Sequence, residues 1–477
     1  FMYLSEIAGK EIVNLTTGER LGVVGECDII VDEVTGDILA LSIPRERGFL
    51  GLRKDKEVLE VPWRNVRKIG NDMIIIEVLV QKFGGTSVAS YEKMKEVCKI
   101  IEAHKEKYKD IAVVVSAMGR KGAPYATDTL IGMCTNINDR PTKRELDMIM
   151  SCGEIISGTI LATMLDSMGI PATFLTGTQA GIITTKAFSN AKIKKINPKK
   201  IQRELADGKV VIIAGFQGGT EDGEITTLGR GGSDTSAVAI GKALGSDLVQ
   251  IYTDVDGIMT ADPRIEPDAK VLKYADYDEV FQMAENGAKV IHPRAVELAK
   301  NADIILQIKN TYNPTFEGTK IGPASMLKDA YEDSSKTKFM SAVAHRDKIA
   351  QVKVIGSEED FSDILNEMED RHINMDMINF LTEKKAFALD VSNLDEVENI
   401  LKQHDVEYEI KPDCAKVTLI GNKVTETPGV IAKIMRALNA ENITLLQSSD
   451  SYNSLSCLVD EKDMVTTVHV IHNAFSA

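Results

Sequence analysis

Cysteine, tryptophan and long apolar runs are scarce in this sequence, and each scarcity excludes a class of protein. The six cysteines form no CxxC pair and most lie in apolar segments (Cys27, Cys98, Cys134, Cys152, Cys414 and Cys457). This pattern predicts reduced, buried thiols rather than disulfides or a zinc site. No apolar run approaches the roughly 20 residues of a membrane span, and the charged N-terminus lacks the apolar core of a secretion signal. We therefore expect a cytoplasmic protein with no membrane partner.

Positive charge is also in deficit. The 477 residues include 56 Lys and Arg against 71 Asp and Glu, which gives a net charge of −15 and a pI near 5.1. This balance disfavours nucleic acid as a partner. The one basic cluster, 192–200, contains no aromatic residue and is expected to be a solvated face. His469 and His472 share a face of the last expected helix, where we expect surface residues rather than a metal-binding pair.

The length suggests about three domains, and the pattern of the chain changes twice. In residues 1–78, short β-rich runs alternate with turn signals such as Thr17-Gly18, which predicts a small β-barrel. Residues 79–325 alternate strand and helix, which predicts an α/β/α sandwich with a mostly parallel sheet.

The C-terminal part of the sequence repeats itself. The run Gln351–Gly356 recurs as Lys416–Gly421, and each copy precedes a helix, two strands and another helix. This order predicts two ferredoxin-like (βαββαβ) domains, 338–412 and 413–477. Neither repeat holds a cluster of catalytic residues, so a sensor is a more natural interpretation than a second active site.

A glycine turn, Lys82-Phe-Gly-Gly-Thr-Ser87, is the most informative short segment. An expected strand precedes it and an expected helix, about 88–107, follows it. Glycines allow close approach of the backbone, and the N-terminus of a helix favours negative charge, so this arrangement suits a phosphate group. The lysine precedes the glycines, which differs from the Walker pattern. By itself the segment fits a plain tight connection equally well.

Four further polar segments fall at expected strand ends or helix starts: Ser116–Gly119 with Thr127–Leu130, Ser151–Glu154, Thr226–Asp234, and Tyr252–Gly257 continued by Met259–Arg264. Each acid has a common structural explanation. Glu154, expected at the start of a helix, would complement the helix dipole, and Asp254 would form a turn. A turn with three glycines seldom needs an Arg and an Asp beside it, so Thr226–Asp234 is the strongest of the four.

Taken together, these groups predict phosphoryl transfer. Lys82 and Arg230 would neutralise a polyphosphate, and Asp234 and Asp254 would position its metal or nucleotide. No His or Cys lies near these segments to act as nucleophile or base, and a carboxylate acceptor, already ionised at pH 7, needs none. Glu154 suits a substrate ammonium, and Arg230 suits a second carboxylate. An acidic amino acid fits this description.

The segments KFGGTS, SCGE, TLGRGGSD, TDVDGIMTADPR and GAKVIHPR (287–294), in this order, resemble those of aspartate kinases in the amino-acid kinase family. The resemblance covers residues 79–477. It implies transfer of the γ-phosphoryl group of MgATP to the side-chain carboxylate of L-aspartate, giving 4-phospho-L-aspartate. That reaction opens the biosynthesis of lysine and diaminopimelate, threonine and methionine. ATP and Mg²⁺ are the implied cofactors, with no metal site made by the protein alone.

The resemblance also implies roles for single residues. Lys82 would stabilise the transferring phosphoryl group, with backbone room from Gly84 and Gly85, and Asp234 would lie by the phosphates. The residues expected to hold aspartate are Thr127, Glu154, Arg230 and Ser233. Those expected to line the nucleotide site are Thr253, Asp254, Arg264 and Lys289. Met259 stands where many relatives have tyrosine.

The two C-terminal repeats resemble paired ACT domains, through which such kinases form homodimers and sense an end-product amino acid (lysine, threonine or meso-diaminopimelate). Met375 and Asp376 match effector-binding positions, and Thr427–Val430 is a loop typical of these domains. The run Gln447–Asp450 is similar to that of the diaminopimelate-sensitive kinases of spore-forming Gram-positive bacteria. Residues 2–78 resemble the sporulation-linked PRC-barrel proteins.

Two alternatives stay open. The chain could be another amino-acid kinase (glutamate 5-kinase, acetylglutamate kinase or uridylate kinase), although those relatives lack the KFGGTS form and the tandem ACT copies. It could also be a catalytically silent amino-acid sensor. The presence of Lys82, Glu154, Arg230 and Asp234 disfavours this second alternative.

Overall fold

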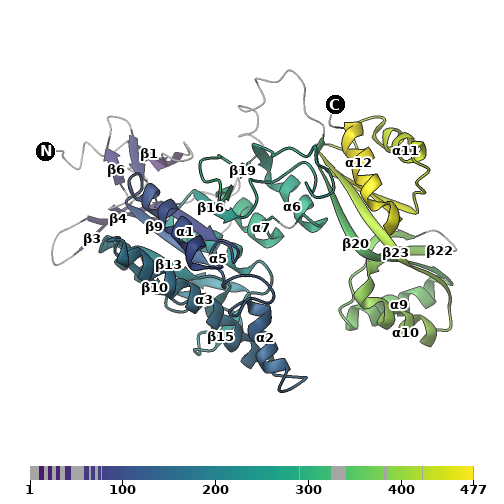
Figure 1. Cartoon of the computed structure of the whole chain (residues 1–477), viewed down its shortest axis with the longest axis horizontal. Helices are drawn as coiled ribbons and strands as arrows, with labels where there is room; N and C mark the ends of the chain where they lie inside the picture. The colour runs from purple at the N-terminus through teal and green to yellow at the C-terminus, as the bar shows by residue number, and fades with distance from the viewer. Residues whose placement is uncertain are drawn as a thin grey trace. The chain divides into compact units, whose positions relative to one another are not determined.

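The computed structural model describes residues 10–14, 20–23, 28–32, 38–44, 58–63, 66–69, 73–76, 78–288, 290–323, 340–380, 384–421 and 423–475. The chain divides into two compact units (Figure 1). The first comprises residues 1–257 and 294–323, and the second comprises 258–293 and 324–477.

The described part of the N-terminal region consists of strands in two small sheets, β2-β1-β7-β6 and β3-β4-β5. All printed pairings are antiparallel except the parallel pair of β1 with β7. The prediction of a small all-β module is confirmed. The strands are β1 (Glu11–Asn14), β2 (Arg20–Val23), β3 (Asp28–Val31), β4 (Ile38–Pro44), β5 (Val58–Pro62), β6 (Val66–Ile69) and β7 (Met73–Ile76).

A larger sheet forms the centre of the first unit, with the order β10-β13-β9-β8-β16-β18-β19. Its strands are parallel except β19, which is antiparallel to β18, so the prediction of a mostly parallel sheet is confirmed. The strands are β8 (Val78–Phe83), β9 (Asp110–Val115), β10 (Ala172–Leu175), β13 (Val210–Ala214), β16 (Leu248–Thr253), β18 (Ile305–Asn310) and β19 (Thr319–Gly322).

Helices cover this sheet on both faces. On one face α1 and α3 pack against Ile111, Val113 and Val115 in a single apolar core. On the other face α5 packs close to the sheet, since Gly215 lies between Ser233 and Val114. The helices of this unit are α1 (Tyr91–Lys105), α2 (Thr127–Thr135), α3 (Lys143–Ser167), α4 (Lys199–Ala206), α5 (Gly232–Leu244) and α7 (Pro293–Ala302).

The long helix α3 corrects one expectation. Among the described residues it is the one helix long and apolar enough, by length and composition, to cross a membrane. Leu161 and Leu165 on this helix are fully buried in the core of the first unit. Its apolar character is therefore that of a core helix, which packs on a sheet along one side. The expectation that no apolar segment reaches spanning length was wrong.

A small second sheet of the first unit, β12-β11-β14-β15, stands beside the start of α5. The strands are β11 (Ile182–Thr184), β12 (Ile193–Ile196), β14 (Gln217–Gly219) and β15 (Ile225–Thr227).

The second unit contains a six-stranded sheet, β21-β22-β20-β23-β25-β24. The long strands β20 and β23 each serve both repeats, because 340–346 pairs with 416–421 and 349–355 pairs with 407–414. Helices lie at the two ends of this pair in Figure 1. The elements are β20 (Met340–Ile355), α9 (Glu358–Asp370), β21 (Asp376–Phe380), β22 (Lys384–Asp390), α10 (Leu394–Gln403), β23 (Glu407–Gly421), α11 (Val430–Ala440), β24 (Gln447–Ser451), β25 (Ser454–Asp460) and α12 (Met464–Phe475).

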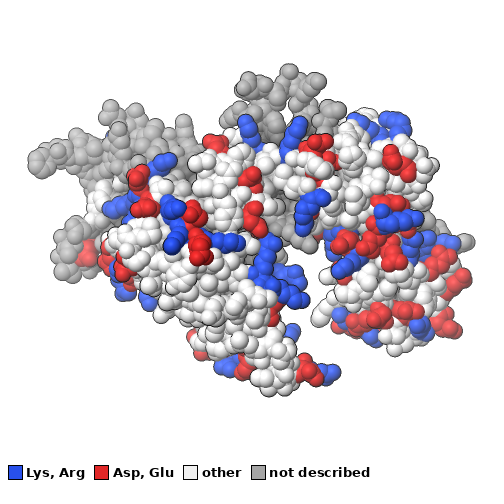
Figure 2. Space-filling view, viewed as in Figure 1, with Lys and Arg blue, Asp and Glu red and all other residues white. Residues whose placement is uncertain are grey.

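Each repeat has its own apolar core between its helices and the sheet, which confirms the two ferredoxin-like arrangements. Figure 2 shows acidic and basic side chains interspersed over the part of this unit that carries α9 and α10. Such a mixed surface is typical of a solvated face rather than of one that binds a polyanion.

The segment 258–293 belongs to this second unit, with β17 (Tyr274–Asp276) and α6 (Tyr277–Glu285). Thr260 O accepts a 2.7 Å hydrogen bond from Val343 N, and Ala261 lies in the core of the second repeat. His472 is only 3% exposed, and its Nε2 lies 2.9 Å from Thr260 Oγ1. The expectation of a surface position was wrong for His472, because the segment covers this face of α12.

Candidate active site

Three of the polar segments singled out in the sequence, Lys82–Ser87, Ser116–Gly119 and Tyr252–Gly257, lie at the ends of neighbouring strands of the large sheet. Ala214, Val115, Phe83 and Tyr252 pair in one row across four adjacent parallel strands. The segments that follow them in the chain therefore leave the sheet at the same edge. The carboxyl ends of parallel strands are where ligands bind in open α/β sheets.

Lys82 and Asp234 form an ion pair at this edge. Lys82 Nζ lies 2.6 Å from Asp234 Oδ1, and each side chain is 11% exposed. Lys82 comes from β8, and Asp234 comes from the first turn of α5, which is also the positive end of that helix dipole. The pair fixes an ammonium group beside the N-terminus of a helix, where an anion would be attracted by both.

The two glycines after Lys82 have different structural roles. Gly84 N donates to Tyr252 O at 3.1 Å, and Gly85 O accepts from Gly119 N at 2.9 Å. A Cβ atom on Gly85 would lie 2.7 Å from the carbonyl oxygens of Ala117 and Gly119, so a side chain is excluded there. A Cβ atom on Gly84 would instead meet Lys82 Nζ at 3.7 Å. Gly84 therefore keeps the space beside the ammonium open.

Glu154 is buried in the middle of α3, so the expectation that it starts a helix was wrong, and the helix dipole does not explain it. Its side chain is 2% exposed. Oε1 accepts a 3.0 Å hydrogen bond from Ala117 N, at the end of β9, while Oε2 has no hydrogen-bond partner among the described residues. Burial raises the pKa of this carboxyl to about 8. A group of this kind is a candidate for binding a cation.

The loop between β15 and α5 presents Arg230. Gly229 and Gly231 adopt φ angles of 76° and 68°, which favour glycine, and Gly231 is the N-cap residue of α5. Arg230 is exposed, and its side chain makes no hydrogen bond or ion pair with another residue in the described part of the chain. Ser233, by contrast, is 8% exposed. The loop thus holds a free guanidinium at the N-terminus of α5.

Thr127 is the first residue of α2 and is half-buried. Thr253 and Asp254 lie at the end of β16, where Thr253 Oγ1 donates to Asp254 Oδ1 at 3.2 Å. Asp254 Oδ2 also accepts a 2.8 Å hydrogen bond from Arg120 Nη2. Arg120 was not singled out from the sequence, although its place directly after Ser116–Gly119 was a signal that could have identified it.

Phe216 is a second residue that the sequence did not indicate. It follows β13, and its backbone φ of 66° is unusual for a residue with a side chain. Its N–H donates to Ser236 Oγ on α5 at 3.1 Å, and its carbonyl accepts from Leu228 N at 2.9 Å. Phe216 thereby ties the end of β13 to the loop that carries Arg230.

Other candidate residues lie apart from this set. Arg264 belongs to the second unit, where its Nη2 lies 2.6 Å from Asp262 Oδ2 and hydrogen bonding to that carboxylate raises the pKa of the guanidinium. Met259 forms an isolated β-bridge with Val271. Lys289 lies outside the described residues. The first unit therefore brings together Lys82, with its two glycines, and Asp234.

The candidate effector residues lie in the first repeat. Met375 packs against the apolar core of that repeat, and Asp376 Oδ2 lies 2.6 Å from Lys416 Nζ. Lys416 is on β23, so this ion pair joins the first repeat to the first strand of the second.

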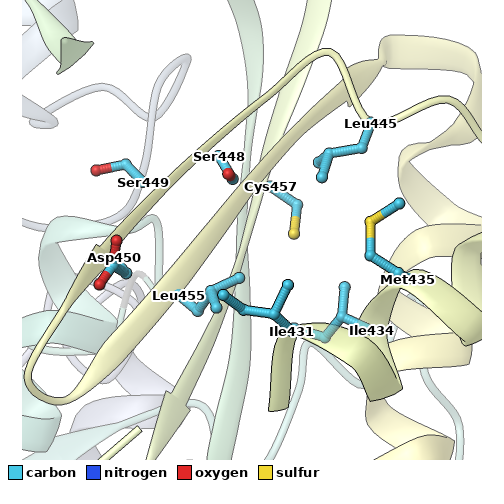
Figure 3. Close-up of a pocket in the computed structure, with 9 residues that line it drawn as sticks. All are labelled: Ile431, Ile434, Met435, Leu445, Ser448, Ser449, Asp450, Leu455 and Cys457. Atoms are coloured by element: carbon cyan, nitrogen blue, oxygen red, sulfur yellow. The ribbon is translucent and has the colours of Figure 1, made fainter. Parts of the chain in front are cut away.

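The second repeat contains a small pocket between α11 and β24 (Figure 3). The side chains of Ile431, Ile434, Met435 and Leu445 approach Cys457 on one side, and Ser448, Ser449 and Asp450 lie on the other. The pocket has room for at least one water molecule.

Comparison with known families defines the class of protein. The model of the amino acid kinase family matches residues 77–310, that of the ACT domain matches 409–473, and that of the PRC-barrel domain matches 1–81. Among solved structures, E. coli aspartokinase III in complex with aspartate and ADP (R-state) superposes with a TM-score of 0.69 at 23% identity, covering 84% of this chain and all of that chain. Clostridium acetobutylicum aspartate kinase gives a TM-score of 0.66 at 22% identity, with the same coverage. These likenesses show the fold.

Sequence relatives define the family more closely. Aspartokinase 1 of Bacillus subtilis is 39% identical over 407 residues, which cover 84% of this chain and 99% of that protein. The aspartokinase of Geobacillus stearothermophilus is also 39% identical, over 409 residues that cover 83% of this chain and 97% of that protein. The chain belongs to the aspartokinase family.

Proposed function

We propose that this chain transfers the γ-phosphoryl group of MgATP to the side-chain carboxylate of L-aspartate, giving 4-phospho-L-aspartate and ADP. The Lys82–Asp234 ion pair beside the helix N-terminus carries the proposal, because phosphoryl transfer depends mainly on fixed positive charge and positioning. The E. coli relative that shares the fold binds aspartate and ADP, which supports the same pair of ligands here.

In this proposal aspartate is held at both of its ends. The ammonium group would lie beside Glu154, whose unsatisfied Oε2 and raised pKa are those of a buried carboxyl that lacks a cation. Arg230, free of other partners in the described chain, would hold the α-carboxylate with two parallel hydrogen bonds. Thr127 and Ser233 would supply neutral hydrogen bonds. The remaining carboxylate needs no general base, since it is ionised at neutral pH.

The phosphate groups would lie over Gly84 and Gly85, where the backbone beside Lys82 carries no side chain. Asp234 holds the Lys82 ammonium in place. Thr253, Asp254, Arg264 and Lys289 would line the nucleotide site.

Mg²⁺ would supply further charge neutralisation at the phosphates. Among the described residues, no group of three or more His, Cys, Asp or Glu could hold a metal ion. Mg²⁺ would arrive on the nucleotide, because it keeps water and phosphate oxygens as ligands and needs only one or two protein carboxylates, which Asp234 and Asp254 would supply.

The two repeats would regulate this activity as ACT domains. Residues 338–412 and 413–477 would form the regulatory pair of a cytoplasmic homodimer, behind a catalytic domain at 79–325 and an accessory domain at 1–78. An end-product amino acid (lysine, threonine or meso-diaminopimelate) would bind near Met375 and Asp376, where its amine would compete with Lys416 for the carboxylate. Segment 258–293 packs on the repeats within the second unit, which provides a physical connection from effector to the Arg264 region.

The test is ADP release from MgATP with L-aspartate, repeated with lysine, threonine and meso-diaminopimelate added singly. Aspartate-dependent release inhibited by one of them would support both the kinase and the regulatory assignment. Glutamate, acetylglutamate and uridylate as acceptors test the other kinases of this fold. A folded protein that binds one effector but releases no ADP would favour the catalytically silent sensor.

A further inference from the structure

A buried carboxylate on α3 lies outside the set of residues assigned above. Asp147 is fully buried (0% exposed), one turn into the helix that also carries Glu154. No ion pair joins it to a cation in the described part of the chain. Burial of an ionised carboxylate without a cation is costly unless hydrogen bonds satisfy its oxygens.

Two residues supply those hydrogen bonds. Ser189 N lies 2.9 Å from both carboxylate oxygens, and Ser189 Oγ donates to Oδ1 at 3.2 Å. Thr227 N donates to Oδ2 at 2.8 Å, and Thr227 Oγ1 donates to Oδ1 at 2.8 Å. A single carboxylate therefore gathers the donors of two segments that are far apart in the sequence.

Both segments flank the loop that carries Arg230. Thr227 is the last residue of β15 and directly precedes that loop. Ser189 has a φ of 67°, an unusual conformation for serine, and its carbonyl oxygen would lie 3.2 Å from a Cβ atom on Gly229. Hydrogen bonds to Asp147 therefore hold Ser189 in a strained backbone conformation, at the point where its carbonyl oxygen lies beside the Arg230 loop.

The side chain of Arg294 also contacts the segment beside the Arg230 loop. Arg294 Nη1 donates to Asn190 Oδ1 at 2.8 Å and contacts Leu228 O at 3.3 Å. Ala191 N donates to Thr227 O at 2.9 Å. Segment 189–191 is therefore tied to the start of the loop, directly at Thr227 and through Arg294 at Leu228. The Arg230 side chain itself makes no hydrogen bond or ion pair with another described residue.

We propose that Asp147 is a positioning residue, which places the Arg230 loop for the α-carboxylate of the substrate by holding Ser189 and Thr227. The proposal rests on the function proposed above, in which Arg230 binds that carboxylate. A misplacement of a binding group by about 1 Å is enough to cost roughly 100-fold in catalytic efficiency. Asp147 therefore acts on substrate affinity without touching the substrate.

The first variant is Asp147→Asn, which keeps the shape but turns an NH₂ group toward the N–H donors of Ser189 and Thr227. We expect the KM for L-aspartate to rise at least tenfold, while the KM for ATP changes less than twofold. Hydrogen exchange should become faster in 189–191 and 227–231. Thr227→Val removes the hydroxyl group that donates to Asp147 Oδ1 and should raise the aspartate KM severalfold. This second variant tests the proposal if Asp147→Asn does not fold.

Leu161→Ala is the matched control on the same helix, because Leu161 is fully buried but packs in the apolar core away from this loop. It should lower the melting temperature and leave the aspartate KM within twofold. If Leu161→Ala raises the aspartate KM as much as Asp147→Asn, the effect is one of general stability and the proposal is overturned. An active wild-type enzyme with an unchanged aspartate KM in Asp147→Asn also overturns it. A wild-type protein without aspartate-dependent turnover overturns the proposed function itself, and the positioning role with it.

Discussion

Lys82 Nζ lies 2.6 Å from Asp234 Oδ1, and this contact joins the end of a central strand to the first turn of α5. Each side chain is nearly buried, so water solvates neither charge well. Each charge is instead compensated by the opposite charge of its partner. The pair therefore has two consequences, one for the reaction and one for folding, and substitutions can separate them.

Lys82→Met should reduce kcat by roughly 100-fold or more, because fixed positive charge at a transferring phosphoryl group contributes on that scale. It should also lower the free energy of unfolding by roughly 3 kcal/mol, since Asp234 is left buried without its cation. The double variant Lys82→Met, Asp234→Asn should recover most of this stability and none of the activity. Denaturant titration and ADP release measure the two effects. Near wild-type kcat in Lys82→Met would refute the role of the lysine.

Glu154→Gln should bind L-aspartate poorly and yet be more stable than the wild type at alkaline pH. The pKa of Glu154 is raised from 4.5 to about 8, so the folded protein keeps a proton that the unfolded chain releases in this range. The free energy of unfolding of the wild type should therefore fall as pH rises from about 4.5 to about 8, by up to about 1.4 kcal/mol per unit. The variant lacks this slope, and melting curves at pH 5.5 and 8 test the difference.

The same group predicts a pH dependence of substrate binding. An ammonium group requires Glu154 as a carboxylate, so the KM for aspartate should fall as pH rises from 7 toward 8, by up to about tenfold per unit below the pKa. Glu154→Gln should show a high KM without this slope. A pH-independent KM in the wild type would indicate that Glu154 does not bind the ammonium group.

Arg230→Lys should raise the KM for aspartate by roughly 10- to 100-fold, because a single ammonium cannot replace a planar, two-pronged contact. Its stability should stay close to that of the wild type, since the Arg230 side chain is exposed and makes no hydrogen bond or ion pair with another described residue. Arg120→Lys is the matched control, as it alters an exposed arginine that faces Asp254 instead. It should leave the aspartate KM unchanged. Equal effects of the two substitutions would contradict the assignment.

Gly85→Ala and Gly84→Ala should differ, although the residues are neighbours. A Cβ atom at Gly85 would lie 2.7 Å from two backbone carbonyl oxygens that cannot move freely, so we expect a loss of about 1–3 kcal/mol of stability. At Gly84 the nearest atoms would be at 3.6 and 3.7 Å, which is ordinary contact. This variant should fold normally but raise the KM for ATP, since the methyl group lies beside Lys82. Thermal melting together with the KM for ATP separates the two cases.

Much of the local structure could be predicted because its causes are local. Ser90 caps α1 through a hydrogen bond from Lys93 N, a contact between residues only three positions apart in the chain. The alternation of strand and helix predicted the parallel sheet, and the repeated run predicted the two ferredoxin-like folds.

Other features depended on contacts between distant residues. Glu154 lies in mid-helix and His472 is covered by Thr260, and neither position could be recognised from the neighbouring sequence. The segment Tyr252–Arg264 reads as one motif, but the structure divides it between two compact units after Gly257. The role of Asp147 could not be recognised either, because its hydrogen-bond partners Ser189 and Thr227 are far from it in the sequence.

The sequence by itself determined the class of fold, the order of the domains, the family and the residue types at the candidate site. These follow from periodicity, turn chemistry and motif order, which depend only on the order of residues in the chain. Only the tertiary structure decided which charge faces which, as with Lys82 and Asp234, and which carboxylates are buried. Ion pairing, desolvation and the pKa of Glu154 depend on distance and on exclusion of water, and both arise only when separate elements pack together.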